Sequence, residues 1–210
     1  MKILLHPSYL PSIATFAVIA QHNVEWEAHD NFQKQTYRNR CYIATDKGKH
    51  MLNIPIKHVG EKEGRQKYAD VIIENAYNWK KEHWRTLETA YRASPFFEFY
   101  EDDIKPIYEC STDSLYNFNL KAIRIIGDCI GVKIPIQMTE KYALTPENNV
   151  DARFLVEAKK EKNWGLEPYN QVFEERHGFI SNLSILDLLF NEGTNAISYL
   201  KTVSLNLQHV

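Results

Sequence analysis

The chain has 210 residues, of which 44% are hydrophobic and 25% charged, a composition typical of a folded globular protein. Its 25 basic and 27 acidic residues give a formal net charge of −2, which argues against a strong global attraction to nucleic acid or anionic membranes. A chain of this length buries about 70% of its unfolded surface, so it needs neither a disulfide nor a metal to form a core. We expect a single domain covering residues 1–210.

Cysteine usage gives no sign of a disulfide framework or a zinc site. The three cysteines, Cys41, Cys110 and Cys129, are widely spaced, with no CxxC pair and no clustered histidines. We expect each to be a small core residue and predict no bound metal. The apolar run at the N-terminus is too short for a signal peptide, and no run approaches transmembrane length. We therefore expect a cytoplasmic protein without an integral membrane segment.

The first segments predict a strand, a turn and a helix. Residues 3–5 form a short apolar run typical of a buried strand, which ends at His6. Ser12 is a suitable N-cap for a helix extending to Gln21. His6 and Tyr9 then lie between a strand end and a helix start, where open α/β sheets bind ligands and free N–H groups favour an anion. His6 is either an acid, base or ligand-orienting donor, or a histidine bonded to a turn carbonyl.

A weakly alternating segment at 24–28 predicts a second strand. Asp30, just after it, is either a turn residue, which its side chain favours, or a carboxylate that meets the arginines further along. From Thr36 we expect an extended chain, whose side chains alternate between two faces. One face then carries Thr36, Arg38, Arg40 and Tyr42, and the other carries Tyr37, Asn39, Cys41 and Ile43.

In that strand the guanidinium groups of Arg38 and Arg40 point the same way, about 7 Å apart. Guanidinium groups bind carboxylate and phosphate oxygens through paired hydrogen bonds, and neighbouring cations repel unless an anion or an acidic side chain lies between them. The pair therefore predicts an anion site. The alternative is that both arginines lie on a solvated sheet face or pair with acidic side chains of the chain itself.

A hairpin is predicted next. Asp46-Lys47-Gly48 is expected to be the turn between the arginine strand and a strand at 50–56. The charged segment 57–67 is either a solvated connection or a flap. Alternation at 69–73 predicts one more strand.

The rest of the chain is mainly helical in pattern. Helices are expected at 79–93, at 96–100, from Asp113 or Ser114 to Gly131, and from Ser184 to Gly193. Short strands are expected at 134–136 and 171–174, while 139–168 has the weakest pattern and is expected to be irregular, with a helix at 151–160. The predicted fold is a single α/β domain with a mixed sheet, β-hairpins in the N-terminal part and a mainly helical C-terminal half.

Two residues in predicted helices carry possible chemistry. His83 lies beside the apolar stripe of Trp84, Leu87 and Tyr91, so it is either a core histidine or a functional one. Asp187 lies three residues after Ser184, so it is either a helix-start residue or a carboxylate facing a site. Walker, Rossmann, serine-elbow and HExxH motifs are absent, so the sequence identifies no cofactor.

Several blocks of this sequence resemble the WbqC-like protein family. In chain order they are Tyr9-Leu10-Pro11, Asp30 to Arg40, Leu52-Asn53-Ile54-Pro55, Trp79 with His83-Trp84 and Tyr91, and Leu183 to Asn191. They span nearly the whole chain, and the Arg38-Asn39-Arg40 block is fairly specific to the family. The chain departs from many members in having His6-Pro7 where they carry Gln-Pro, and residues 12–16 where they carry a Trp followed by Gly-Tyr-Phe.

The resemblance implies a role in bacterial surface-polysaccharide synthesis, including O-antigen and lipopolysaccharide gene clusters. It also implies transferase activity, such as aminoacyl or acyl transfer to an amino sugar. The expected partner is a small-molecule substrate, a nucleotide-activated sugar or an acyl donor, and not a nucleic acid.

Our hypothesis from the residues is that Arg38 and Arg40 bind the donor anion, Asn39 and Tyr9 orient it, and one acid or base moves a proton. The proton-transfer candidates are His6, Asp30 and His83. The remaining ligand-binding candidates are Gln33, Lys34, Tyr37 and Asp187. Because Cys41 is expected to be buried, direct transfer is preferred over a covalent intermediate. The rival hypothesis is a non-catalytic protein that binds a sugar nucleotide or a partner enzyme through the same groups.

Overall fold

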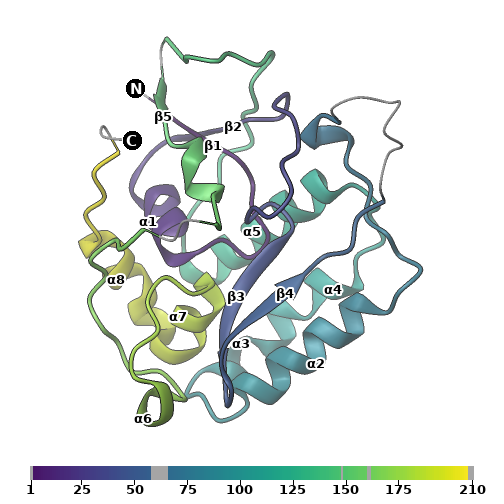
Figure 1. Ribbon diagram of the computed structural model, residues 1–210. Coiled ribbons are helices and arrows are strands. Elements are labelled where there is room, and N and C mark those ends of the chain that lie inside the picture. The colour runs from purple at the N-terminus through teal and green to yellow at the C-terminus, as the bar shows by residue number, and fades with distance from the viewer. Residues whose placement is uncertain (1, 58–65, 148, 160–161, 208–210) are drawn as a thin grey trace.

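The computed structural model describes residues 2–57, 66–147, 149–159 and 162–207 (Figure 1). A small parallel sheet has β1 (Lys2–Leu5) at its centre, between β2 (Val24–Trp26) and β5 (Asn149–Asp151). Ile3 of β1 is paired with Val24 on one side and with Val150 on the other. The apolar run at the N-terminus is buried because it forms the central strand.

Helix α1 (Ile13–Gln21) connects β1 to β2, as predicted. The hydroxyl group of Ser12 accepts a hydrogen bond from the backbone N–H of Thr15 at 3.4 Å, which satisfies one of the free donors at the helix start. The predicted cap, helix and second strand are therefore confirmed.

An antiparallel hairpin forms a second sheet, made of β3 (Arg40–Thr45) and β4 (Gly48–Asn53). Arg40 pairs with Asn53 at its open end, and Thr45 pairs with Gly48 at the turn. Gly48 has a φ of 92°, a backbone conformation that glycine adopts without strain. The predicted hairpin is confirmed, and its strands form a sheet separate from the parallel one.

Helices make up most of the remaining chain. In order they are α2 (Trp79–Tyr91), α3 (Phe97–Ile104), α4 (Pro106–Glu109), α5 (Leu115–Ile130), α6 (Glu174–His177), α7 (Ile185–Glu192) and α8 (Ala196–Thr202), with 3-10 helices at Tyr68–Asp70, Arg153–Val156 and Gly193–Asn195. Ser114 and Ser184 cap α5 and α7 through their side chains, and Gly131 and Gly193 end them, as predicted. The α/β class with a mainly helical C-terminal half is confirmed.

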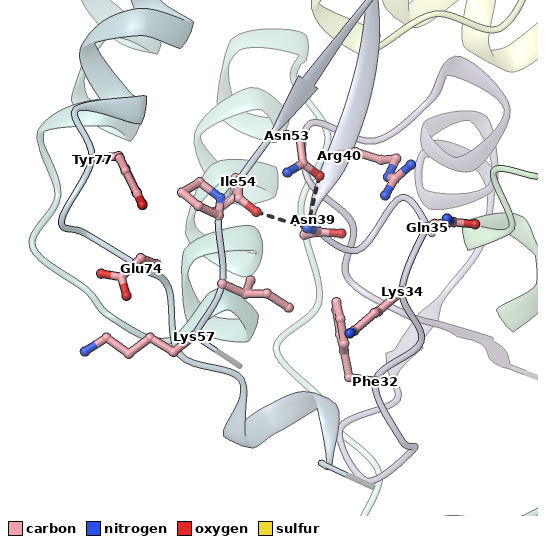
Figure 2. A pocket seen from close by; sticks show the side chains of 12 residues that line it. Phe32, Lys34, Gln35, Asn39, Arg40, Asn53, Ile54, Lys57, Glu74 and Tyr77 are labelled. Atoms are coloured by element: carbon pink, nitrogen blue, oxygen red, sulfur yellow. Dashed lines mark hydrogen bonds between the residues drawn. The ribbon is translucent and has the colours of Figure 1, made fainter. Parts of the chain in front are cut away.

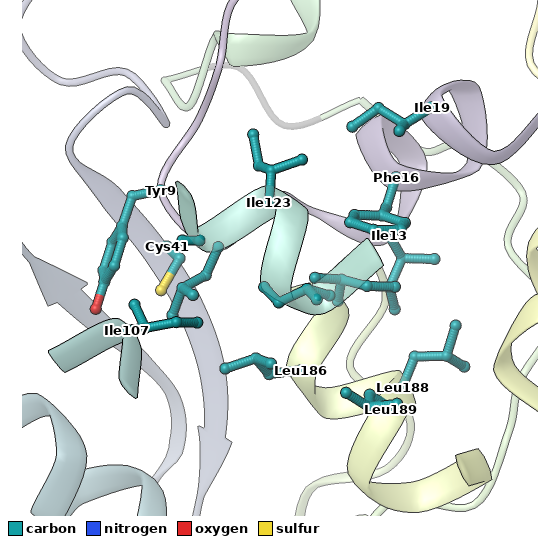
Figure 3. Close-up of a cluster of buried hydrophobic side chains, with 14 of the residues drawn as sticks. Tyr9, Ile13, Phe16, Ile19, Cys41, Ile107, Ile123, Leu186, Leu188 and Leu189 are labelled. Carbon is teal, nitrogen blue, oxygen red and sulfur yellow. The ribbon is translucent and has the colours of Figure 1, made fainter. Parts of the chain in front are cut away.

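One core joins the helices to the hairpin (Figure 3). Its central side chains include Ile13 and Phe16 of α1, Cys41 of β3, Ile123 of α5 and Leu186 and Leu189 of α7, all of them buried. Burying one such large apolar side chain stabilises the fold by about 1.5–3 kcal/mol. Of the cysteines, Cys41 is buried as predicted, whereas Cys110 and Cys129 are partly exposed; all three are free thiols.

The arginine strand starts later than predicted. β3 begins at Arg40, and the chain before it is not a continuous strand: turns at 34–35 and 37–38 flank Thr36, which forms an isolated bridge with Glu157, and Gln35 has a φ of 62°. The strict alternation expected from Thr36 is therefore wrong before Arg40. The turns send Arg38 into the protein interior while Arg40 stays on the outer face of the hairpin.

Other predicted elements were also wrong. Residues 69–73 form part of a 3-10 helix and two isolated bridges, because Ile72 and Ile73 each pair with a single residue, Ser114 and Ile56. Residues 134–136 and 171–174 are not strands. The predicted helix at 151–160 starts as the end of β5 and continues as a 3-10 helix, so tertiary pairing overrides local propensity there.

Of the charged segment 57–67, residues 58–65 lie outside the described part of the chain, so neither the flap nor the solvated-connection hypothesis is tested. Within the described ranges, no helix combines the length and the apolar character needed to cross a membrane.

The end of α7 provides a test of close packing. Gly193 has a φ of 55°, and a Cβ atom at this position would lie 2.6 Å from the ring of Phe96. Gly131 also has a positive φ, of 80°, but a Cβ atom at that position would meet nothing within 4 Å. We expect Gly193→Ala to lower the free energy of unfolding by about 3 kcal/mol and Gly131→Ala by about 1 kcal/mol, measured by urea denaturation. Equal losses in the two variants would contradict the role of Phe96.

Candidate functional site

Charged residues gather where the three parallel strands end. His6 directly follows β1, Glu27 directly follows β2, and Asp151 is the last residue of β5. Because the strands are parallel, their carboxyl ends lie at one edge of the sheet, which is where ligands of open α/β sheets bind. The cluster at this edge also contains Arg38 and Asp30, brought in by the loop after β2.

The guanidinium group of Arg38 is the centre of this cluster. Its Nη2 lies 2.7 Å from His6 Nε2 and donates to Asp30 Oδ2 at 3.0 Å. The guanidinium carbon lies 5.5 Å from the centre of the Tyr68 ring, which adds a cation–π contact. Arg38 is only 1% exposed, and its Nε and Nη1 have no hydrogen-bond partner among the described residues. The structure thus answers the question about Asp30: its Oδ1 accepts from the N–H of Asn31 in a turn, and its Oδ2 meets an arginine.

Burial determines the charge states in this cluster. Desolvation lowers the pKa of His6 to about 4, since neighbouring Asp30 only partly offsets it. A neutral His6 presents a lone pair at Nε2, which accepts the hydrogen bond from Arg38. Burial alone would raise the pKa of Asp30, but the adjacent His6 and Arg38 groups outweigh it and lower that pKa below its usual value.

Hydrogen bonds hold the Arg38 backbone in place. The Nδ2 of Asn119 on α5 donates to the carbonyl oxygen of Arg38 at 2.7 Å and lies 2.6 Å from the hydroxyl oxygen of Tyr68. That hydroxyl in turn donates to the carbonyl oxygen of Pro7 at 2.6 Å. The network connects α5 and the 3-10 helix at 68–70 to the end of β1.

A second charged group lies at the same edge of the sheet. Glu27 is fully buried, and its Oε2 lies 3.4 Å from Nη1 of Arg153. The Nη2 of Arg153 donates to Asp151 Oδ2 at 2.6 Å. Each of these three charges therefore has a partner of opposite sign.

A cavity of about 560 Å³ opens at the end of the hairpin, beside this edge (Figure 2). Its lining consists of Phe32, Lys34, Gln35, Asn39, Arg40, Asn53, Ile54, Pro55, Ile56, Lys57, Glu74 and Tyr77. We call it the Arg40 pocket. Figure 2 shows Lys34, Gln35 and Arg40 on one wall, and Lys57, Glu74 and Tyr77 on the opposite wall. The floor is apolar, which suits a ligand with both charged and apolar parts.

The cations of the Arg40 pocket have no ionic partner among the described residues. Lys34, Arg40 and Lys57 form no ion pair with any described residue, and the Nε of Arg40 is buried without a hydrogen-bond partner among them. Asn39 donates to Asn53 Oδ1 at 3.1 Å and to the carbonyl oxygen of Ile54 at 3.0 Å, while its own Oδ1 is buried without a described partner. The pocket therefore offers three positive charges, one carboxylate at Glu74 and an unused amide oxygen. This combination fits an anion that also carries a hydrogen-bond donor.

The structure divides the predicted site residues among several places. Lys34, Asn39 and Arg40 line the Arg40 pocket, whereas His6, Asp30 and Arg38 form the cluster behind it. The prediction that both arginines share one face is wrong, because the turns before β3 bury one of them. Of the remaining candidates, Gln33 is exposed and outside the pocket lining, and Tyr37 is buried.

Tyr9 and His83 form a separate buried pair. The hydroxyl group of Tyr9 lies 2.8 Å from Nδ1 of His83 and 3.0 Å from the hydroxyl oxygen of Tyr108. Burial, with a smaller contribution from the charge of His50, lowers the pKa of His83 to about 4. Neither residue lines the Arg40 pocket.

Asp187 is fully buried in α7. It accepts hydrogen bonds from the hydroxyl groups of Tyr91 at 2.6 Å and Tyr169 at 2.5 Å, and from Gln171 Nε2 at 3.1 Å. Burial raises its pKa although these bonds act in the opposite direction. Asp187 therefore ties α7 to α2 and to the chain before α6, and it does not face the Arg40 pocket.

Sequence reasoning missed several lining residues. Lys57, Glu74 and Tyr77 enter the pocket from the chain between β4 and α2, and Glu27 and Arg153 belong to the sheet edge. None of them lies in a recognisable motif. A signal existed only for Glu27, a carboxylate near the end of the strand predicted at 24–28.

These observations define an α/β protein with a small parallel sheet, a separate hairpin and a cavity lined by cationic side chains at the open end of that hairpin. The model of the WbqC-like protein family matches residues 6–163, and the chain belongs to this family. The uncharacterized protein Rv1507c of Mycobacterium tuberculosis (strain ATCC 25618 / H37Rv) is 28% identical over 229 residues, covering 94% of this chain and 96% of that protein. No solved structure matched the chain.

The buried histidines predict a loss of stability in mild acid. An unfolded histidine binds a proton below pH 6.5, whereas His6 resists protonation until about pH 4 in the folded state. This difference in pKa adds about 3 kcal/mol to the free energy of unfolding above pH 6.5. The added stability is lost as the pH falls from 6.5 to about 4. We expect His6→Gln, which keeps an acceptor for Arg38, to reduce this loss in urea denaturation series across that range.

His22→Gln is the matched control, because it makes the same exchange at an exposed position outside the Arg38 cluster. A His6→Gln protein with the same loss as the wild type would show that His6 is not the group responsible.

Proposed function

We propose that this protein is a cytoplasmic transferase of bacterial surface-polysaccharide synthesis, of the O-antigen type, acting as one WbqC-like domain over residues 1–210. The Arg40 pocket binds the phosphate or carboxylate of an activated donor. The observation that carries the proposal is the set of three cations in this pocket that have no ionic partner among the described residues.

The donor anion lies between Arg40 and Lys34 on one wall and Lys57 on the other. Asn39 and Gln35 supply hydrogen bonds that orient it, and the apolar floor takes its uncharged part. Arg38 acts indirectly, because its buried guanidinium group holds the loop that leads to Asn39 and Arg40. Its role is therefore that of a positioning residue.

Glu74 is the carboxylate best placed to move a proton in this pocket. In acyl transfer to an amino sugar, the amine nitrogen forms a bond to the carbonyl carbon of the donor. The bond from that carbon to the leaving group breaks, and its electron pair goes with the leaving group. Glu74 takes the proton that the nitrogen releases, and Arg40 or Lys57 balances the charge that the leaving group gains. Burial raises the pKa of the Cys41 thiol, so the core cysteine stays protonated and direct transfer is preferred.

Binding of the donor is tested first. UDP-N-acetylglucosamine serves as the nucleotide-sugar probe and acetyl-coenzyme A as the acyl probe, with thermal shift and calorimetry as readouts. We expect Arg40→Gln to weaken binding of the recognised probe about tenfold or more, because a charge-assisted hydrogen bond contributes roughly 1.5–3 kcal/mol. Lys121→Gln, an exposed lysine outside the pocket, is the control and should bind normally. Unchanged affinity in Arg40→Gln would rule out this pocket as the donor site.

Catalysis is tested with the donor that binds. We expect Glu74→Gln to lower kcat about 10²-fold or more while donor affinity stays the same, because the amide keeps the size of the side chain and cannot accept the proton. A kcat unaffected by this change would remove Glu74 from the mechanism.

The second candidate is a non-catalytic protein that binds a sugar nucleotide or a partner enzyme. The observation in its favour is that neither His6 nor Asp30 lines the Arg40 pocket. Donor binding that depends on Arg40, with no transfer to any amino-sugar acceptor, would favour this candidate.

A further inference from the structure

A second cavity, of about 410 Å³, lies next to the Arg40 pocket. Its lining consists of Asn75, Tyr77, Asn78, Trp79, Lys80, Lys81, Trp84, Lys105, Tyr108 and Glu109. We call it the Trp84 pocket. It is formed by the first turns of α2, the chain just before α2, the end of α4 and Lys105, which precedes α4.

Residues 74–78 separate the two pockets. Glu74 lines the Arg40 pocket, Asn75 and Asn78 line the Trp84 pocket, and Tyr77 lines both. The side chain of Tyr77 is unusual for an aromatic residue because it is 69% exposed and does not belong to the core. Figure 2 shows it at the edge of the Arg40 pocket, on the same wall as Glu74. The aromatic ring of Tyr77 is therefore shared by the linings of both cavities.

The Trp84 pocket combines three kinds of contact. Trp84 is partly exposed beside the buried rings of Trp79 and Tyr108, and with Tyr77 it offers apolar faces to the C–H groups of a ring. Asn78 precedes α2 and its side chain makes no capping hydrogen bond to the described helix, and an amide can both donate to and accept from hydroxyl groups.

Positive charge is in excess in this pocket. Lys81 and Lys105 are exposed and form no ion pair with the described residues, whereas the Nζ of Lys80 donates to the carbonyl oxygen of Cys110. Glu109 is the one carboxylate in the lining. Two uncommitted lysines and one carboxylate favour a ligand with a negative charge.

We propose that the Trp84 pocket binds an acidic saccharide, a sugar that carries a carboxylate or a phosphate. Trp84 and Tyr77 contact the face of the sugar ring, Asn78 binds its hydroxyl groups, and Lys81 and Lys105 bind its acidic group. Resting on the proposed function, this saccharide is part of the acceptor, since Tyr77 and the neighbouring Glu74 bring it next to the donor.

Glucuronate tests the site directly, with glucose as the uncharged counterpart. Saturation-transfer NMR on the full chain at millimolar ligand should give a signal for glucuronate that exceeds the glucose signal at least threefold. We expect Tyr77→Ala and the double variant Lys81→Ala/Lys105→Ala each to reduce the glucuronate signal at least threefold. Tyr77→Phe, which keeps the ring, and Lys121→Ala, outside both pockets, should retain it. Circular dichroism checks that each variant is folded.

Two results would overturn the proposal: no saturation transfer from the wild type to glucuronate, or a glucuronate signal that survives in both Tyr77→Ala and the double lysine variant. The two donor probes, UDP-N-acetylglucosamine and acetyl-coenzyme A, distinguish a failure of the saccharide site from a failure of the proposed function. A glucuronate signal that depends on Tyr77, in a protein that binds neither donor probe, supports the saccharide site and removes the transferase. Donor binding that depends on Arg40, without any glucuronate signal, supports the donor site of the transferase and rules out the saccharide site.

Discussion

Taking the guanidinium group of Arg38 out of water costs several kcal/mol unless charges and hydrogen bonds compensate for it. Compensation comes from Asp30, from the lone pair of a neutral His6 and from the face of the Tyr68 ring. Each partner comes from a different stretch of the chain. Satisfying one buried charge therefore fixes the loop after β2, the end of β1 and the 3-10 helix at 68–70 relative to one another.

The same constraint sets the geometry of the Arg40 pocket. Because Arg38 points into the sheet edge and its carbonyl oxygen is held by Asn119, the two residues that follow have defined places. Asn39 bonds to the end of β4, and Arg40 begins β3 with its side chain on the outer face. The three residues of the Arg38-Asn39-Arg40 block thus have three roles: Arg38 holds the loop, Asn39 closes the hairpin and Arg40 lines the cavity.

Local rules were sufficient for elements with strong local signals. The caps Ser12, Ser114 and Ser184 and the hairpin turn were predicted, because each depends on a few neighbouring residues. β5 was missed because it has only three residues and no strand pattern of its own. These residues form a strand because they pair with the edge of β1. Of the predicted ligand-binding residues, Lys34, Asn39 and Arg40 line one cavity, and their role in binding stays a prediction. The separation of the two arginines depends on the turn at Gln35, and Glu74 and Tyr77 approach from a distant segment, which spacing in a sequence does not reveal.

The β3–β4 hairpin places its two faces under different constraints. One face carries Cys41, Ile43 and Leu52, which are packed in the core. A change of one methylene group in such a core already alters packing and stability. Arg40 and Asn53 on the other face contact the cavity, and exchanges at such partly exposed positions usually change stability by about 0.5 kcal/mol or less. Residues at the open end of the hairpin can therefore be exchanged at little cost in stability while the buried face preserves the fold.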